Sequence, residues 1–281
     1  MTGVQTCAPS DLRIESITKE RERIGTELHL ARRIQTGSLP NVFPPFPEHK
    51  EFDIFATMQP AREVGGDFYD FRLIDDDHLF LAIADVSGKG IPAALFMMGT
   101  KILLANNAKS GKTPAEILQS TNESICANNK EEMFVTVWIG ILELSTGKLT
   151  AANAGHEYPV IRHKDGPFEI LKDRHGIVLG AMEGLTFSEY EILLEPGASI
   201  FVYTDGIPEA SNADKKLFGM QRTVEALNSM GAAGGLAGAG PLDPEKILDT
   251  VRRAVEDYVK DAPQFDDMTM MCLTYAGPQK E

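Results

Sequence analysis

Four acidic residues far apart in the chain each stand where an apolar, strand-like segment meets a turn. Asp67 follows a pair of glycines, Asp85 ends an apolar run before a glycine-rich turn, Asp205 ends a second run, and Asp266 precedes a third. One Asp beside Gly is ordinary turn chemistry. Four such strand ends predict one convergent site, where the carboxylates repel one another and lose hydration unless divalent cations relieve the conflict. A fold that brings four strand ends together is therefore required.

Five short motifs in register carry a family resemblance. The chain resembles the SpoIIE-type branch of the metal-dependent serine/threonine protein phosphatases (PPM, protein phosphatase 2C-like) over about residues 35–275. The motifs are Val-Gly-Gly-Asp-Phe-Tyr-Asp from residue 64, Asp-Val-Ser-Gly-Lys-Gly from residue 85, Asn-Ala-Gly-His from residue 153, Tyr-Thr-Asp-Gly from residue 203 and Asp-Asp-Met-Thr from residue 266.

Along the chain, predicted β-hairpins alternate with pairs of predicted helices. This order of elements excludes a doubly wound parallel sheet. Two antiparallel sheets packed together with helices outside satisfy this pattern, and the resemblance implies the same α+β, α–β–β–α sandwich. The pattern predicts helices over 91–108, 114–128, 217–230 and 244–259. It predicts strands over 52–58, 67–73, 78–84, 134–144, 148–152, 158–162, 168–171, 187–194, 199–203 and 268–274.

The N-terminal part predicts a helix from a cap at Ser10 or Asp11 to about residue 36, with a narrow apolar face that needs a partner. It either docks on its own domain or dimerises as a signalling helix, and the resemblance favours the second. We expect a helix and linker over 1–36, the phosphatase domain over 37–276 and a tail over 277–281. The first ten residues look foreign to the family, 40–47 is expected to be an extended linker, and 231–240 a flexible insertion.

Composition restricts the class of partner. The chain has 281 residues, 43% hydrophobic and 24% charged, and a formal net charge of −14. Such acidity argues against a nucleic-acid footprint or an anionic membrane surface. No signal peptide or segment long enough to span a bilayer is evident, and the three cysteines (Cys7, Cys126 and Cys272) show no metal-type spacing. We expect a cytoplasmic protein.

The resemblance implies two metal ions held by oxygen ligands. Asp85 is expected to bridge both ions with help from the Val86 carbonyl, Asp67 to serve one ion, and Asp205 with Asp266 the other. Carboxylate and carbonyl oxygens favour Mn²⁺ or Mg²⁺. These four aspartates are also the expected catalytic residues, because two metals activate water directly. Asp267 stands where many relatives have Asn, so either member of the pair can be the ligand, with Asp266 favoured.

Other residues are weaker candidates for the chemistry. Arg62, five residues before Asp67, and Lys89, on the glycine turn, are predicted phosphate contacts. Each is equally explained as a surface or turn residue. Asp70 is expected to support the site or to belong to its strand. His156 either donates a proton to the leaving oxygen or orders its own turn, and the second role is favoured.

The most favoured function is dephosphorylation of phosphoserine or phosphothreonine on a regulatory protein. The resemblance implies an anti-sigma-factor antagonist in a bacterial partner-switching circuit, with homodimerisation through the N-terminal helix. A non-catalytic scaffold of the same fold is an alternative. A diguanylate cyclase, prompted by Gly65-Gly66-Asp67-Phe68, is a distant one, because Phe68 stands where that family's loop has Glu. We also expect displacement of the 91–108 helix to alter metal binding, since that helix begins beside the Asp85 turn.

Overall fold

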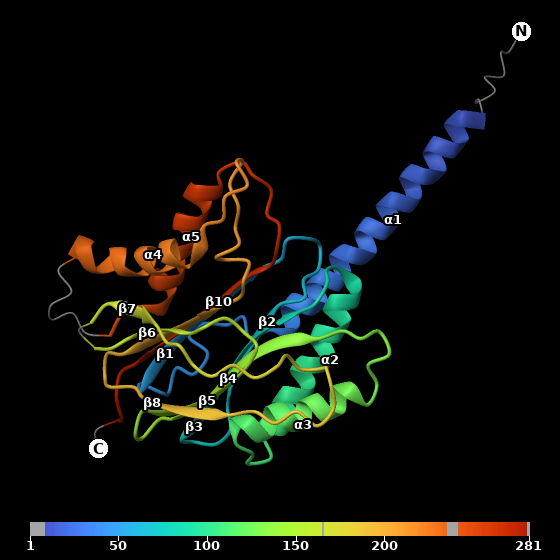
Figure 1. The fold of residues 1–281 in the computed structure, drawn as a ribbon. Coiled ribbons are helices and arrows are strands. Elements are labelled where there is room, and N and C mark those ends of the chain that lie inside the picture. Colours follow the sequence, from blue (N-terminus) through green and yellow to red (C-terminus); the bar gives the residue numbers. More distant parts are fainter. Residues whose placement is uncertain (1–8, 165, 235–240, 280–281) are drawn as a thin grey trace, which may run out of the picture.

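Two five-stranded antiparallel sheets face each other in the computed structural model, which describes residues 9–164, 166–234 and 241–279 (Figure 1). The first sheet has the order β1 (Phe52–Gln59), β10 (Met268–Tyr275), β9 (Ser199–Tyr203), β6 (Val160–Arg162) and β7 (Phe168–Ile170). The second has the order β2 (Phe68–Leu73), β3 (His78–Val86), β4 (Val135–Glu143), β5 (Lys148–Ala154) and β8 (Glu189–Leu193).

Paired helices cover the outer face of each sheet. Helices α2 (Ile91–Ala108) and α3 (Pro114–Cys126) pack on the second sheet, and α4 (Gly219–Gly234) and α5 (Pro244–Val259) pack on the first. Two helix starts are fixed locally: Thr113 and Glu116 form a capping box at α3, and Asp243 caps α5. The predicted α+β sandwich of four layers is confirmed.

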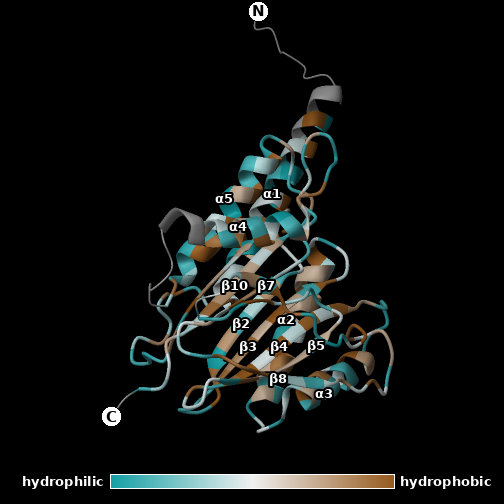
Figure 2. Ribbon diagram, turned by 60° about the vertical axis from the view of Figure 1, so that its left-hand side comes forward, coloured by the Kyte–Doolittle hydropathy of each residue, from teal (hydrophilic) through white to brown (hydrophobic). Residues whose placement is uncertain are grey.

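Apolar side chains form two core clusters, one between the sheets and beneath α2 and α3, and one beneath α4 and α5. Hydrophobic positions run along β2 to β5 in Figure 2, as expected for strands buried on both faces. The largest buried side chain is Trp138, whose Nε1 donates a hydrogen bond to the Tyr190 hydroxyl at 2.8 Å. These packed strands form a rigid frame for the loops at their ends.

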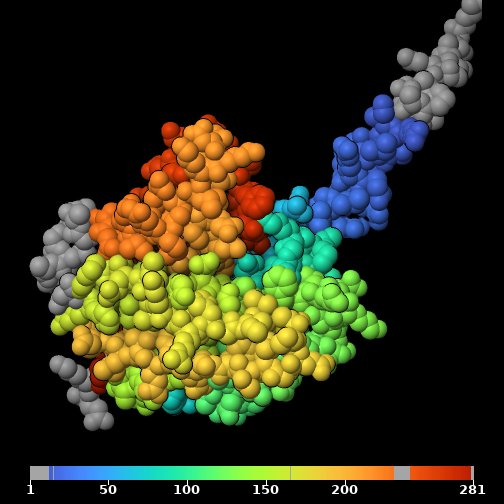
Figure 3. All heavy atoms as spheres, viewed as in Figure 1, coloured from blue at the N-terminus to red at the C-terminus, as the bar shows by residue number. Residues whose placement is uncertain are grey.

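Helix α1 (Pro9–Ser38) stands away from the body of the protein (Figure 3). It starts at Pro9, just before the predicted cap, and runs two residues beyond the predicted end. Only its last turns are covered: Gln35 is buried and Leu28 and Ala31 are half-buried. Farther out, the side chains of Ile17 and Ile24 are 49% and 45% exposed.

Two connections differ from their predictions. The 40–47 segment is not an extended linker, because Phe43 and Phe46 pack against the core and contact aromatic rings of β1 and β2. Residues 231–234 continue helix α4, while 235–240 lie outside the described residues. The predicted strand and helix positions otherwise agree with the structure to within a few residues at each end. Within the described parts of the chain, no helix is long and apolar enough to traverse a bilayer.

Candidate active site

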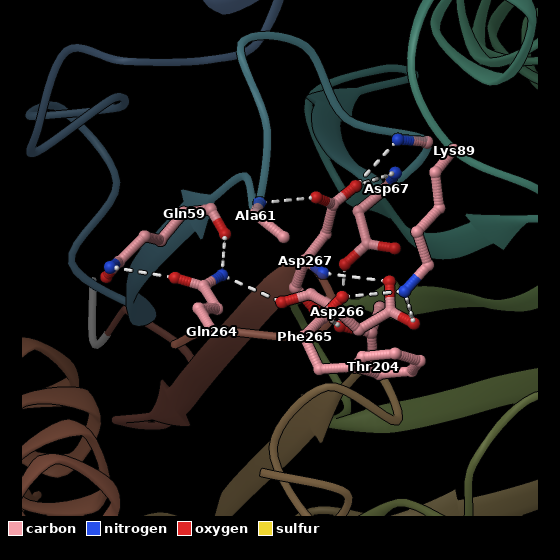
Figure 4. Close-up of polar contacts among 10 residues, drawn as sticks. Gln59, Ala61, Asp67, Lys89, Thr204, Gln264, Phe265, Asp266 and Asp267 are labelled. Carbon is pink, nitrogen blue, oxygen red and sulfur yellow. Dashed lines mark hydrogen bonds and ion pairs between the residues drawn. The ribbon is translucent and has the colours of Figure 1, made fainter. Parts of the chain in front are cut away.

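Four strand ends meet at one end of the sandwich, and each carries an aspartate. Figure 4 shows two of these residues, Asp67 and Asp266. Asp67 immediately precedes β2, and Asp85 is the next-to-last residue of β3. Because Phe68 pairs with Ala84 in the second sheet, Asp67 and Asp85 are brought together. Asp205 follows β9 and Asp266 precedes β10, which are neighbours in the first sheet. The sandwich therefore gathers the four predicted ligands from both sheets.

Asp67 is held from the opposite sheet. Its side chain is 1% exposed, and the Thr204 hydroxyl donates a hydrogen bond of 2.7 Å to Asp67 Oδ2. The Thr204 oxygen in turn accepts a 3.0 Å hydrogen bond from the Thr269 amide. This chain of bonds fixes the orientation of the carboxylate. Thr204 was not predicted as a site residue, although it directly precedes Asp205 in the Tyr-Thr-Asp-Gly motif.

Asp267 has a different task from Asp266. Asp267 is buried, and its two carboxylate oxygens accept 2.7 Å hydrogen bonds from the amides of Ala61 and Gly66. It thus holds the loop that leads to Asp67. Asp266 is half-buried and turns its carboxylate toward Lys89, whose ammonium lies 2.7 Å from Asp266 Oδ2.

Lys89 is tied to the segment before β10. Besides Asp266, its ammonium donates a 2.7 Å hydrogen bond to the Phe265 carbonyl and lies 3.9 Å from the centre of the Phe265 ring. A cation over an aromatic face adds attraction to the ion pair. The structure therefore engages Lys89 with the acidic residues of the site.

The carboxylates are in electrostatic conflict. Burial, together with the charges of Asp85 and Asp267, holds the pKa of Asp67 well above its ordinary value. Burial and the charge of Asp205 raise the pKa of Asp85 to about 7. Burial and the charge of Glu209 raise the pKa of Asp205 to about 6. Crowded acids with raised pKa values mark functional sites more often than structural ones.

Glycines allow the backbone to approach these carboxylates. A Cβ at Gly66 would lie 3.0 Å from the Val86 carbonyl oxygen and 3.2 Å from the Ala93 Cβ. A Cβ at Gly206 would overlap the Asp267 backbone. Position 206 therefore requires glycine for steric reasons, and a side chain at position 66 would force its neighbours to shift. An all-oxygen set of one buried carboxylate, three half-buried ones and a nearby carbonyl fits the ligand preferences of Mg²⁺ and Mn²⁺.

The remaining predicted residues fall into two groups. Arg62 is exposed at the rim, where a Cβ at Gly90 would lie 3.9 Å from its Nη1. Asp70 faces away from the four aspartates: it is buried, pairs with Arg72 and lies 3.4 Å from the Lys101 ammonium on α2. Asp70 therefore connects β2 with α2.

His156 orders its own turn. Its Nδ1 lies 2.8 Å from the Thr136 hydroxyl, and its amide donates a 2.7 Å hydrogen bond to Asn153 Oδ1. The ring is buried, and burial lowers its pKa to about 3. A neutral, enclosed imidazole is a poor proton donor at neutral pH.

Helix α1 reaches the site through Gln35, which was not predicted as a site residue although the family resemblance begins at this position. Its side-chain amide donates a 2.7 Å hydrogen bond to the Gly65 carbonyl and accepts a 3.1 Å hydrogen bond from the Gly65 amide. Gln35 therefore holds the residue two positions before Asp67. The signals in the sequence are the start of the family resemblance at residue 35 and the position of this polar residue on the same helical face as Leu28 and Ala31.

A second group of possible ligands lies at the other end of β3. Among the described residues, the one group of three ligand atoms within 4.8 Å of one another belongs to Asp77, His78 and Glu143. These side chains are already hydrogen-bonded to neighbouring residues, including Ser145, Asp75 and Thr146. Among the four aspartates, all of which the structure describes, no three carboxylate oxygens from different residues lie within 4.8 Å of one another.

Comparison with known proteins identifies the family. A sequence profile described as Stage II sporulation protein E (SpoIIE) matches residues 75–276. The chain belongs to the SpoIIE family. It therefore carries a protein phosphatase domain of the metal-dependent, protein phosphatase 2C-like type.

Relatives at the sequence level include Protein IcfG of Synechocystis and the phosphoserine phosphatases RsbU and RsbP of Bacillus subtilis. The chain is 31% identical to Protein IcfG of Synechocystis over 88% of its own length and 41% of that protein. It is 32% identical to phosphoserine phosphatase RsbU of Bacillus subtilis over 67% of its length and 55% of RsbU. The chain thus spans about half the length of the curated relatives it matches.

Solved structures agree on the fold. The SiaA-PP2C domain of Pseudomonas aeruginosa superposes with a TM-score of 0.77 at 21% identity, covering 91% of this chain and 98% of that one. The phosphatase domain of SpoIIE from Bacillus subtilis, in a structure with part of its regulatory domain, gives 0.66 at 18% identity over 79% and 63%. A related structure, RsbX, was solved in complex with magnesium.

Proposed function

We propose that this chain is a phosphatase that hydrolyses phosphoserine or phosphothreonine on a regulatory protein, with two Mn²⁺ or Mg²⁺ ions. The observation that carries the proposal is the convergence of Asp67, Asp85, Asp205 and Asp266 from four strand ends, with pKa values raised at three of them. The raised pKa values describe the protein without a cation. Divalent cations would remove the repulsion that raises them.

The ligand assignment follows the positions of the carboxylates. Asp85, whose pKa is raised by the charges of both Asp205 and Asp266, would serve both ions, with the Val86 carbonyl beside it. Asp67 would serve one ion and Asp205 with Asp266 the other. Asp266 is preferred over Asp267 because the Asp267 carboxylate is occupied by backbone amides.

The chain's own residues position these ligands. Thr204 orients Asp67 across the two sheets, and Asp267 fixes the 61–67 loop. When bound, two ions acidify a water molecule and neutralise the phosphoryl oxygens. Arg62 lies at the rim, where its guanidinium can bind a phosphate by donating two parallel N–H hydrogen bonds. For Lys89 the proposed phosphate contact requires release from Asp266, to which it is bound in this structure.

Metal-dependent phosphate release tests the proposal directly. The protein should hydrolyse p-nitrophenyl phosphate and a phosphoserine peptide, lose this activity in EDTA and regain it with Mn²⁺ or Mg²⁺. Full activity after exhaustive EDTA treatment would overturn the two-metal proposal. Inactivity with both ions on every phosphoprotein offered would favour the non-catalytic scaffold.

The cyclase alternative loses its structural basis. Gly65-Gly66-Asp67 lies in the crossover from β1 in the first sheet to β2 in the second, and not at the tip of a hairpin. Assaying GTP turnover in the same preparation provides the direct check, because a cyclic dinucleotide product would restore that alternative.

We propose an anti-sigma-factor antagonist, phosphorylated on serine or threonine, as the substrate, in the cytoplasm. Support comes from the named phosphoserine phosphatases RsbU and RsbP among the relatives and from the free thiols of Cys126 and Cys272. Incubating phosphorylated candidate antagonists with the protein and following loss of the phosphate by mass spectrometry identifies the substrate.

We further propose a phosphatase domain over 37–276, a short tail over 277–281, and a homodimer through the preceding helix. Ile14, Ile17 and Ile24 recur at heptad spacing on α1, and all three are exposed. An apolar stripe of this spacing is buried when two helices coil together. Sedimentation of the full chain should give a dimer, and the double variant Ile17→Glu/Ile24→Glu a monomer. A monomeric parent chain would exclude this arrangement.

A further inference from the structure

We propose that a groove beside Asp266 binds the substrate polypeptide next to its phosphorylated residue, accepting an apolar side chain and, farther along, a basic one. The inference rests on the proposed phosphatase function and adds to it a rule for substrate selection. The groove runs from the Asp205–Gly206 turn along the C-terminal end of α5.

The groove begins at the acidic site itself. A cavity of about 170 Å³ is bordered by Asp266, one of the four aspartates, and by Gly206, which directly follows Asp205. It continues into a wider hollow of about 750 Å³ that shares one wall with it. The shared wall consists of Ser211, Val259, Lys260, Ala262, Pro263, Gln264 and Phe265. A polypeptide whose phosphoserine reaches the aspartates can therefore extend along this surface.

The wall next to the site is held in place by two glutamines (Figure 4). Gln264 donates 2.8 Å and 2.7 Å hydrogen bonds to the carbonyls of Gln59 and Asp266. Gln59 returns a 3.1 Å hydrogen bond to the Gln264 side chain. These bonds tie the 263–266 segment to the end of β1, so the groove keeps a fixed position relative to Asp266. A fixed spacing between pocket and reacting group is what sequence selection near a phosphoserine requires.

The chemistry of the lining points to the class of residue that binds. Val259, Ala262 and Met268 offer apolar surface, and the Phe265 side chain is 69% exposed at the mouth. An exposed aromatic ring beside a cavity is typical of a recognition site. An aliphatic side chain of the substrate would cover this surface and gain its hydrophobic free energy.

Charge identifies the second preference. Apart from Asp266, the two hollows are lined by four carboxylates (Glu209, Glu256, Asp214 and Asp261) and two ammonium groups (Lys215 and Lys260). The excess of negative charge favours Lys or Arg in the bound segment. It also disfavours a second copy of this chain as the occupant, since the chain carries a formal net charge of −14.

A charge-reversal pair tests the groove. Glu256 lines it, whereas Asp257, the next residue of α5, is exposed outside both hollows. The probe is a fluorescein-labelled peptide with one phosphoserine flanked within three residues by Leu and Lys. Glu256→Lys should raise its KM and its Kd about fivefold, the scale of one exposed charge contact. Asp257→Lys should change neither, and both variants should hydrolyse p-nitrophenyl phosphate at the parental rate.

The apolar preference has its own variant. Ala262 belongs to the shared wall and lies in a loop, so Ala262→Phe should narrow the groove. It should weaken binding of the Leu peptide about tenfold, but leave a peptide with Gly in place of Leu unaffected; thermal unfolding checks that the fold is intact. If the parent, Glu256→Lys and Ala262→Phe proteins bind the peptide with equal affinity, the proposal that this groove binds the substrate is wrong. Anisotropy reports binding even without turnover, so failure of the phosphatase proposal appears separately, as absence of metal-dependent hydrolysis.

Discussion

The two ends of strand β3 carry the same kinds of residue in opposite circumstances. At the His78 end, Asp75, Asp77 and Glu143 each accept hydrogen bonds from neighbouring groups in the turns. Hydrogen bonds from the Asp77 amide and the His78 ring lower the pKa of Asp75. At the other end, burial and neighbouring charges raise the pKa values of Asp67, Asp85 and Asp205.

The difference separates structural acids from functional ones. Surface carboxylates beside hydrogen-bond donors stabilise the turns that hold them. Buried carboxylates facing one another destabilise the protein without a cation, and proteins keep such arrangements where function needs them. Residue type alone does not distinguish the two ends of β3. They differ in how deeply the carboxylates are buried and in how many hydrogen-bond donors lie beside them.

The strongest test of this comparison replaces one carboxylate at each end of β3 with the uncharged amide of Asn. Asp85→Asn should lower metal-dependent turnover by about 10²–10³-fold or more, because it removes the charge placed between both proposed ion positions. Asp75→Asn should leave turnover unchanged, since that side chain contributes only to a turn. Steady-state phosphate release measures both, with circular dichroism as the control for folding. Parental activity of Asp85→Asn would show that the functional end has been misassigned.

Much of the fold and the gathering of the aspartates was predictable because local signals agreed. Helix α2 has the predicted bounds, since Pro92 and the glycine turn fix its start. Strand β9 also has its predicted bounds and reads as a continuous apolar run because every residue in it is buried. Each aspartate could be placed at a strand end from its neighbours alone.

Contacts across the two sheets could not be read from the sequence. Thr204 and Asp67 are 137 positions apart, and Lys89 and Asp266 are 177 apart. Neither pair shares a periodicity or a turn signal, because their meeting depends on how the sheets stack. The 40–47 segment was wrongly predicted as an extended linker for the same reason. Its prolines were visible, but the aromatic rings that Phe43 and Phe46 contact lie on β1 and β2.

A smaller effect is expected when an aspartate keeps its charge but loses its support. Thr204→Val removes the hydroxyl that donates to Asp67 and accepts from the Thr269 amide. Mn²⁺ affinity measured by isothermal titration calorimetry should fall about 10–100-fold, the range for loss of a hydrogen-bond partner behind a metal ligand. The matched change at the other end is Thr146→Val, which removes a hydrogen bond to Glu143. An equal loss of affinity in both variants would contradict the distinction between the ends.

Helix α1 provides the next test, because Gln35 holds the backbone that leads into Asp67. Gln35→Ala leaves the buried amide and carbonyl of Gly65 without these partners. The free energy of unfolding in urea should fall by about 1–3 kcal/mol, with a further decrease in Mn²⁺ affinity. Gln221→Ala is the control, since that side chain is exposed on α4 and bonds only to Glu225 within the described residues. Equal stability of the two variants would mean that α1 does not support the site.

The least drastic test varies only pH. The contributions of the aspartates at the two ends of β3 to folding stability should change with pH in opposite directions. Asp85 and Asp205 bind protons more tightly in the folded, metal-free protein than in the unfolded chain, because their pKa values are raised to about 7 and about 6. Their contribution to the free energy of unfolding is therefore fully present below the unfolded-state pKa of about 4 and is lost as pH rises toward 7. Asp75 has a lowered pKa, so its contribution is present above pH 4 and lost on acidification. Being exposed, it contributes little.

Urea unfolding of the EDTA-treated protein at pH 5 and pH 7.5 measures the balance between these contributions. Stability should fall over this interval, and Asp85→Asn should reduce the fall, since the variant has no carboxyl to deprotonate there. Saturating Mn²⁺ should reverse the trend, because ions that bind only the folded state stabilise it most when the carboxylates are ionised. Asp75→Asn should leave the trend as it is. A metal-free protein that becomes more stable from pH 5 to pH 7.5 would show that its buried aspartates are not in conflict, and would remove the physical basis for distinguishing the two ends of β3.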